Sequence, residues 1–388
     1  MKRLLSFLLI STFLFNPASV AATKKPVVKS LQLLANIGSS EEFAGLVTSG
    51  KTIVVFGNKG DKSIAKALDA SGKELWNIAL DNASPSVATA GAVDSSGNIW
   101  IAGSTSLQRP IATASPTASP LNPDKITLVP DIFTTELNAF SLWSINPTNL
   151  ALAQYSLQLD SPVLINSIGV DKAGITSVGS SGALITSDLS GKIQKPIFIG
   201  TGATNFESLV KQSDGSITIV GSSTETIGGK KLAGKVDGVI LKLSKAGNLI
   251  SVVRSSAPKA ARNWNSLTST FLLGGAVVTG SKIESAITKF SNTYTPQWTY
   301  RFTSSGPTFT SGSTYALIQS TASIKELSNW SPKAPQPLLL AFDSKGLIAG
   351  AYSAPAEQKE VLGLYNSKEL GLLCITSSAE SVSIFTLK

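Results

Sequence analysis

The side chains of this sequence that could carry out acid–base chemistry are carboxylates. The chain contains no histidine, which excludes a histidine-dependent catalytic triad and a histidine-ligated metal site. Four carboxylates fall in stretches that we expect to connect successive repeat units: Glu41, Glu42, Asp160 and Glu207. Two of them could serve as general acid and general base if their separation and burial were suitable. The alternative, which we prefer, is that all four are solvated loop charges.

No other motif indicates catalysis, a cofactor or a metal. The chain has no phosphate-binding P-loop, no dinucleotide-binding fingerprint and no regular aspartate spacing of an EF-type calcium loop. Its single cysteine, Cys374, lies in the apolar stretch "LGLLCITSS", and catalytic use of this thiol would need an activating base. We expect Cys374 to be a buried, packed side chain. The sequence therefore predicts no metal site and no cofactor.

A second group of residues could bind anions. Lys230, Lys231 and Lys235 lie in one predicted insertion, and the stretch "VRSSAPKAARNW" supplies further basic residues. We assign a candidate ligand-binding role to five residues: Lys230, Lys231, Arg254, Lys259 and Arg262. If both stretches emerge on the same face, their charges could form an anion-binding patch; the alternative is two separately solvated loops. The spacing of the arginines matches no nucleic-acid-binding module, so we expect no nucleic-acid partner.

A repeat that recurs seven times must position these groups. Each copy centres on a β-rich run that ends in a small residue: "TIVVFGN", "NIWIAGS", "GITSVGS", "SITIVGS", "GAVVTGS", "TYALIQS" and "LGLLCITS". The shortest intervals between copies are near the ~40–45 residues expected for one four-stranded propeller blade. Another alternating run and a D/S-x-x-G turn follow, as in "VILKLSKAGNLI", and this pattern predicts a hairpin. Each unit therefore has four antiparallel strands, which we call A, B, C and D.

Two positions recur within the units. The small residue is a glycine in five copies: Gly57, Gly103, Gly179, Gly221 and Gly280. A bulky apolar residue precedes the small residue in each copy: Phe43, Val87, Leu164, Phe206, Trp264, Phe309 and Val361. Because this second column is apolar throughout, we expect its side chains to pack between neighbouring blades, Trp264 included.

The two ends of the sequence indicate how the repeat closes. Residues 30–37 align with the strand D that precedes other A strands, while the last unit, ending in "SVSIFTLK", has no strand D of its own. An N-terminal strand that completes the last sheet removes exposed sheet edges. We therefore predict an all-β fold over residues 30–388, a seven-bladed β-propeller of four-stranded antiparallel blades whose ring is closed by the N-terminal strand. A proline-rich loop insertion, at about residues 106–136, interrupts the second unit.

Two stretches resemble a known repeat. "DSSGNIWIAGST" (94–105) is similar to the D-x-x-G-N-I-Y-V-x-G-x-T unit of bacterial β-propellers of the SBBP (beta-propeller repeat) type, and "DASGKELW" (69–76) is similar to their D-x-x-G-x-x-x-W unit. The resemblance covers roughly residues 30–388, and a few units match strongly. It implies a bacterial propeller and leaves the activity open, since such propellers serve many roles. Asp94 and Gly97 are expected to form a turn of the scaffold.

The first residues have the features of an export signal. Lys2 and Arg3 precede the apolar run "LLSFLLISTFLF", and small residues follow in "NPASVAA". We expect a signal peptide at 1–22, cleaved near Ala21 or Ala22, and a linker at 23–29; the alternative is an uncleaved anchor. The mature chain is expected to have no transmembrane segment. It is expected to be secreted, or located at the cell surface or in the periplasm.

The net positive charge and the expected export together indicate which class of partner this protein binds. The net charge is +9, which becomes +7 once Lys2 and Arg3 are removed, and a basic exported protein is suited to anionic surfaces. The alternative is a charge that serves solubility alone. We expect a monomer with a non-catalytic binding or scaffolding function, whose partner is an anionic polysaccharide, another cell-envelope or extracellular polymer, or a protein. The alternative function is a carbohydrate-active hydrolase or lyase with carboxylates at the channel mouth.

Overall fold

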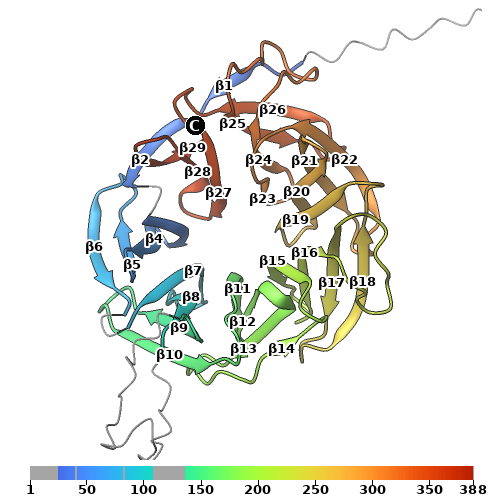
Figure 1. Cartoon of the computed structure of the whole chain (residues 1–388). Coiled ribbons are helices and arrows are strands. Elements are labelled where there is room, and N and C mark those ends of the chain that lie inside the picture. The colour runs from blue at the N-terminus through green and yellow to red at the C-terminus, as the bar shows by residue number, and fades with distance from the viewer. Residues whose placement is uncertain (1–24, 40–41, 82–83, 108–135, 388) are drawn as a thin grey trace, which may run out of the picture.

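The computed structural model describes residues 25–39, 42–81, 84–107 and 136–387. The expected signal peptide, Glu41 and most of the proline-rich insertion lie outside the described residues. Within these ranges the strands form seven sheets arranged in a ring (Figure 1). The predicted all-β, seven-bladed propeller is therefore confirmed, and we number its blades 1 to 7 along the chain.

In blades 1 to 6, strands A to D run in chain order from the centre of the ring to its rim. Blades 1 and 2 contain β3 (Phe43–Ser49), β4 (Thr52–Lys59), β5 (Lys62–Leu68), β6 (Glu74–Ala79), β7 (Ser86–Val93), β8 (Ile99–Thr105), β9 (Ala139–Ile145) and β10 (Leu152–Gln158). Blades 3 and 4 contain β11 (Ile165–Asp171), β12 (Gly174–Gly179), β13 (Ala183–Ser187), β14 (Ile197–Phe198), β15 (Thr204–Lys211), β16 (Ile217–Ser223), β17 (Asp237–Leu243) and β18 (Leu249–Ser255). Blades 5 and 6 contain β19 (Ala261–Leu267), β20 (Leu272–Thr279), β21 (Lys282–Phe290), β22 (Pro296–Thr303), β23 (Phe309–Ser311), β24 (Tyr315–Ser320), β25 (Gln336–Phe342) and β26 (Ile348–Ser353). A short 3-10 helix, η2 (Ser180–Gly182), joins β12 to β13.

Blade 7 joins the two ends of the described chain. It consists of β27 (Glu360–Ser367), β28 (Gly371–Ser377), β29 (Val382–Thr386) and the N-terminal strand β2 (Gln32–Gly38). Strand β2 pairs antiparallel with β29, and the Ser383 hydroxyl donates a hydrogen bond to Asn36 Oδ1 at 2.8 Å. The predicted closure of the ring by the N-terminal strand is confirmed.

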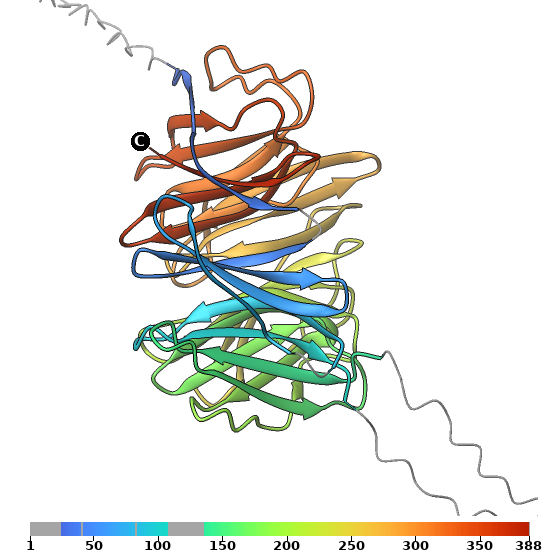
Figure 2. The ribbon, with the colours of Figure 1, turned by 90° about the vertical axis from the view of Figure 1, so that its left-hand side faces the viewer.

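A further N-terminal strand lies outside the repeat. Strand β1 (Val28–Ser30) pairs in parallel with β26, the outermost strand of blade 6. Figure 2 views the ring from its side and shows this blue segment beside the red C-terminal blades. The expected linker at 23–29 therefore includes part of a strand. Three residues are too few to show an alternating pattern, so no sequence signal predicted β1.

In blades 1 to 5, a glycine of strand B faces a bulge in strand A, where the register between the two strands shifts by one residue. A Cβ on this glycine would lie 1.6 to 2.1 Å from a carbonyl oxygen of the bulged strand or of the residue just before it. The five glycines are Gly57, Gly103, Gly179, Gly221 and Gly275. The prediction was right for the first four and wrong for Gly280, which lies in the β20–β21 turn with a φ of +60°. Both glycines occur in "GAVVTGS", so the motif alone could not separate them.

Three members of the apolar column are buried, Phe206, Trp264 and Val361, and Trp264 packs with residues of blades 4 and 5 as predicted. In blade 3 the prediction was displaced by one residue. Ile165 is paired with the strand B glycine and is buried, whereas the Leu164 side chain is 55% exposed. The same displacement puts Ala88, and not Val87, opposite the glycine of blade 2. Spacing along the chain cannot reveal such a one-residue offset, because the bulge in strand A shifts which of its residues pairs with the glycine of strand B.

The expected scaffold turn at Asp94 is confirmed. Asp94 Oδ1 accepts hydrogen bonds from the amides of Ser96 at 2.8 Å and Asn98 at 3.0 Å, and Oδ2 accepts one from Trp100 Nε1 at 3.1 Å. Gly97 has a φ of +88°, a conformation that glycine adopts without strain. The carboxylate therefore holds the turn together. Across the described ranges, no helix has the length and hydropathy needed to cross a membrane.

Candidate functional site

The connection between β16 and β17, residues 224–236, contains the candidate residues Lys230 and Lys231, together with Lys235. It leaves the blade at the edge where β15 begins, because Thr204, Ser223 and Asp237 are register partners across β15, β16 and β17. Strand β18 ends at the same edge, since Gly238 pairs with Ser255. The B–C and D–A connections of this blade therefore emerge on one face of the ring, which we call the upper face.

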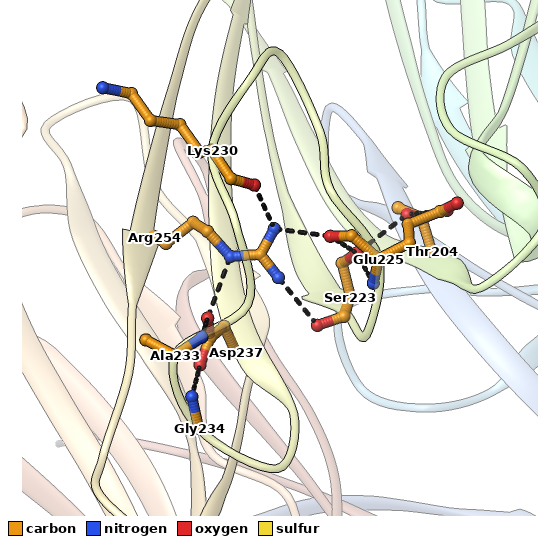
Figure 3. A network of polar contacts seen from close by, with 8 residues as sticks. All are labelled: Thr204, Ser223, Glu225, Lys230, Ala233, Gly234, Asp237 and Arg254. Carbon is orange, nitrogen blue, oxygen red and sulfur yellow. Dashed lines mark hydrogen bonds and ion pairs between the residues drawn. The ribbon is translucent and has the colours of Figure 1, made fainter.

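Arg254, near the end of β18, is the centre of a polar network beneath this connection (Figure 3). Its Nε donates to Asp237 Oδ2 at 2.9 Å. Its Nη1 donates to the backbone oxygens of Glu225 at 2.7 Å and Lys230 at 3.2 Å, and its Nη2 donates to the oxygen of Ser223 at 3.1 Å. The Arg254 and Asp237 side chains are only 7% and 0% exposed. One guanidinium thus ties both ends of the connection to the blade.

Asp237 completes the network from the other side. Its carboxylate accepts hydrogen bonds from the backbone amides of Ala233 at 2.9 Å and Gly234 at 2.8 Å. Burial opposes ionisation of Asp237, but these amides and the Arg254 guanidinium outweigh it and hold the pKa of the carboxyl below its usual value. The ion pair is therefore formed at neutral pH.

These contacts correct the role predicted for Arg254. Its guanidinium is committed to an internal carboxylate and three carbonyl oxygens, so Arg254 shapes the connection and is not an exposed anion ligand. Lys230, Lys231 and Lys259 are exposed, as is Lys235. Anion binding by these lysines stays a prediction.

Arg262, at the start of β19, lies apart from the Arg254 network. The connection of blade 4 packs beside it: the Lys235 amide donates to Ala260 O, and the Arg262 amide donates to Val236 O, each at 2.9 Å. The Arg262 Cζ lies over the Trp264 ring, 4.2 Å from its centroid. Burial, together with the positive charge of Arg301, lowers the pKa of Arg262 to about 10. Arg262 is thus charged at neutral pH but largely removed from water.

Sequence reasoning missed the charged residues that lie near these arginines: Asp237, which pairs with Arg254, and Glu284 and Arg301, which pair with each other in blade 5. Asp237, Glu284 and Arg301 carried no motif, because each acts through a partner on another strand. The one available signal was an acidic residue at the start of a strand C with an arginine at the end of the following strand D. That arrangement occurs in blade 4 as Asp237 and Arg254, which the register brings to the same edge.

The candidate catalytic carboxylates are spread over several blades. Glu42 precedes β3 of blade 1, Asp160 is exposed between blades 2 and 3, and Glu207 lies on β15 of blade 4. Within the described residues, no hydrogen bond joins two of these three side chains. Glu41 cannot be placed, because it lies outside the described ranges. The structure therefore brings together no acid–base pair among the described candidates.

Glu207 has an unusual environment for a carboxylate. Burial raises its pKa above the usual value, although Asn205 Nδ2 donates a hydrogen bond to Glu207 Oε1. The same bulge position holds Asn166 in blade 3 and Asn265 in blade 5. Both asparagines donate from Nδ2 to a backbone oxygen of the following blade, at 2.8 Å in each case. An ionised carboxylate has no proton to donate in this way.

We expect Glu207→Gln to be more stable than wild type at neutral pH. Since the folded-state pKa of Glu207 is raised, ionisation costs the folded state more than the unfolded state, and stability is lost as the pH rises through that pKa. The gain should therefore shrink as the pH is lowered to the usual range of a carboxyl group, which melting temperatures across pH will measure. The reverse change, Asn265→Asp, is the matched control and should lower the melting temperature at neutral pH. Equal melting curves for Glu207→Gln and wild type at every pH would contradict the prediction.

Cys374 lies in the core, as expected. It is buried on β28, and burial raises the pKa of its thiol to about 12. The thiolate that nucleophilic chemistry requires is therefore not formed at neutral pH. The part of the chain that the structure describes holds no group of three or more histidine, cysteine or acidic residues that could bind a metal.

No protein-family model and no curated protein matches the sequence. Solved structures are similar in fold. A structure of U3-55K matches with a TM-score of 0.57 and 9% identity, over 93% of this chain and 100% of that one. The RRP9 WD40 repeats match with a TM-score of 0.55 and 9% identity, over 94% and 99%. The WD40 β-propeller domain of Doa1 matches with a TM-score of 0.56 and 9% identity, over 93% and 98%. At this identity the likeness shows the propeller fold alone, and the finer resemblance to SBBP-type repeats stays a prediction.

Proposed function

We propose that this chain is an exported, non-catalytic binding or scaffolding propeller that acts at the cell surface, in the periplasm or outside the cell. Its upper face binds an anionic polysaccharide, a related polymer or a protein partner. The observation that carries this proposal is the Arg254–Asp237 network, which holds a lysine-bearing connection from within the blade. Because this connection is already fixed, it loses little conformational entropy when a partner binds to Lys230 and Lys231.

A carbohydrate-active hydrolase or lyase has no comparable support. The carboxyl groups of such an acid–base pair lie about 5 to 10 Å apart. Glu42 and Glu207 belong to blades 1 and 4, on opposite sides of the ring (Figure 1). The exposed Asp160, between blades 2 and 3, has no described contact with either. We therefore propose binding and not hydrolysis.

The double variant Lys230→Gln/Lys231→Gln tests the proposed face. At low salt we expect its dissociation constant for an acidic polysaccharide such as polygalacturonate to rise about fivefold. Each of the two exposed charge pairs that are lost contributes about 0.5 kcal/mol. The affinity of wild type should fall as salt is added. The matched control is Lys345→Gln/Lys368→Gln, which removes two exposed lysines from turns on the opposite face. Equal losses in both double variants would show that net charge, and not the upper face, determines binding.

A further inference from the structure

Arg262 has a buried donor without an acceptor. Its Nε is buried and has no hydrogen-bond partner among the described residues, and the same is true of Nε1 of Trp264, over which Arg262 lies. A charged donor removed from water is ordinarily paired, because an unsatisfied buried group costs free energy. The Trp264 ring compensates for only part of this cost. The Nε of Arg262 therefore lacks an acceptor among the described residues.

The sheet register gathers further charged residues on the same side of blade 5. It places Glu284 in the same row as Arg262, and Arg301 in the same row as Trp264. Residues opposite one another in a ladder share one face of the sheet. The two residues between Trp264 and Arg301 in their row are a glycine and an alanine, which leave room for long side chains above them. This face is turned toward blade 4, since a Cβ on Gly238 of β17 would lie 2.8 Å from Trp264.

Positive charge is in excess at this junction of blades 4 and 5. Glu284 Oε1 is 2.8 Å from Lys282 Nζ, and its Oε2 is 2.5 Å from Arg301 Nη2. Both oxygens of this carboxylate are therefore used, and Arg262 has no ion-pair partner among the described residues. The three cationic side chains of Lys282, Arg262 and Arg301 thus stand against one carboxylate, which leaves two positive charges uncompensated.

The adjoining blade does not supply the missing negative charge. Asp237, at the start of β17, is paired with Arg254 and with two backbone amides. The connections that border the junction instead add exposed Lys235 and Lys259. Arg301 and Lys282 are 43% and 60% exposed, so the cationic cluster is open to solvent at the rim of the upper face.

We propose that Arg262, Arg301 and Lys282 form an oxyanion-binding site, which takes a sulfate or phosphate group carried by an extracellular polymer. Guanidinium groups donate two parallel hydrogen bonds to such oxyanions, and an ammonium group adds a point charge. A sulfate or phosphate group has enough terminal oxygens to accept from two guanidinium groups and an ammonium group together. The site deepens the proposed function, on which it rests, by giving the anionic partner a specific chemical group.

The site itself is tested with inorganic ions. Isothermal titration of the purified chain with sodium sulfate and sodium phosphate should give saturable binding, and sodium chloride at equal ionic strength should not. Arg262→Gln is expected to weaken the binding of these ions by about tenfold or more, since charge-assisted bonds to a half-buried guanidinium are lost. Lys345→Gln, on the opposite face, should leave it unchanged. If Arg262→Gln fails to fold, Arg301→Gln tests the same site at a partly exposed side chain. Unchanged sulfate and phosphate binding in the folded variant would overturn the site.

The polymer source is tested separately. Wild type should bind dextran sulfate or polyphosphate more tightly than polygalacturonate, and Arg262→Gln should remove that preference. A preference that survives in Arg262→Gln, or no preference in wild type, would overturn the polymer-borne sulfate or phosphate. If wild type binds inorganic sulfate or phosphate but no polymer and no protein partner, the proposed function fails while the ion site stands. If polymer binding depends on Lys230 and Lys231 but not on Arg262, the proposed function stands and this inference fails.

Discussion

Replacing Gly275 by alanine is expected to lower the free energy of unfolding by about 3 kcal/mol or more, at the upper end of the cost of overpacking a rigid site. The new Cβ would lie 2.1 Å from the carbonyl oxygen of Asn263. Backbone atoms on both sides are fixed by the β19–β20 and β20–β21 ladders, so the clash can be relieved only by giving up the bulge. Chemical denaturation followed by tryptophan fluorescence measures the loss.

Gly280→Asn in the same hairpin is the matched control. Gly280 has a φ of +60° and no non-neighbouring atoms within 4 Å of a Cβ placed on it, and asparagine is, after glycine, a residue that tolerates this left-handed conformation well. Its substitution should cost about 1 kcal/mol or less. The pair separates the bulge glycine from the turn glycine within one motif. A Gly275→Ala protein as stable as Gly280→Asn would refute the steric role of the bulge.

The second large effect is expected at Arg254. Arg254→Met leaves the Asp237 carboxylate buried without its counter-ion and frees the carbonyl oxygens of Ser223, Glu225 and Lys230. Removing one partner of a buried ion pair costs about 3–5 kcal/mol of stability. The 224–236 connection should also lose its fixed shape, which limited proteolysis will report as new cleavage in this segment.

The stability lost in Arg254→Met should depend on pH. The pKa of Asp237 is lowered in the fold, so its contribution is present above the pKa of an unfolded aspartate and is lost as the pH falls through the lowered value. The difference between wild type and Arg254→Met should therefore be largest at neutral pH and decline in acid. The control is Lys242→Met, which breaks a more exposed pair with Asp214 at 4.0 Å and should cost about 0.5 kcal/mol or less. Equal losses for Arg254→Met and Lys242→Met at neutral pH would contradict the role of the buried pair.

The fold could be predicted from the sequence because its signals are local. Turn residues such as Asp94 and Gly97 act within a few positions of themselves, and alternation of apolar residues marks each strand. The closure was also visible, since residues 30–37 resemble a strand that the last unit lacks. Seven repetitions of the same pattern outweighed errors in individual units, such as the one at Gly280.

The candidate site was harder to predict because its chemistry depends on register. Arg254 and Asp237 are seventeen positions apart, and only the antiparallel ladder shows that they meet in the interior. As a residue of a connecting stretch, Arg254 was therefore assigned a candidate role in binding an anion, with a solvated loop charge as the alternative. Arg262 was chosen for its charge alone, whereas its interest comes from Trp264 beneath it and from Arg301, which lies three strands away in the row of Trp264.

The strand β1 has a consequence for how the ring forms. Strand β2 is made early but pairs with β29, and the hydrogen bond between Asn36 and Ser383 spans 347 positions. Contacts of such long range are slow to form, because the loop between them must first be closed. Docking of β1 on β26, continued by the hydrogen bond from the Leu31 amide to Ser353 O, can precede the synthesis of blade 7. The docked β1 keeps β2 next to blade 6, close to the place where β29 pairs with it. Closure of the ring then requires only that β29 find a nearby strand, and the long loop between residues 36 and 383 no longer has to be closed in one step.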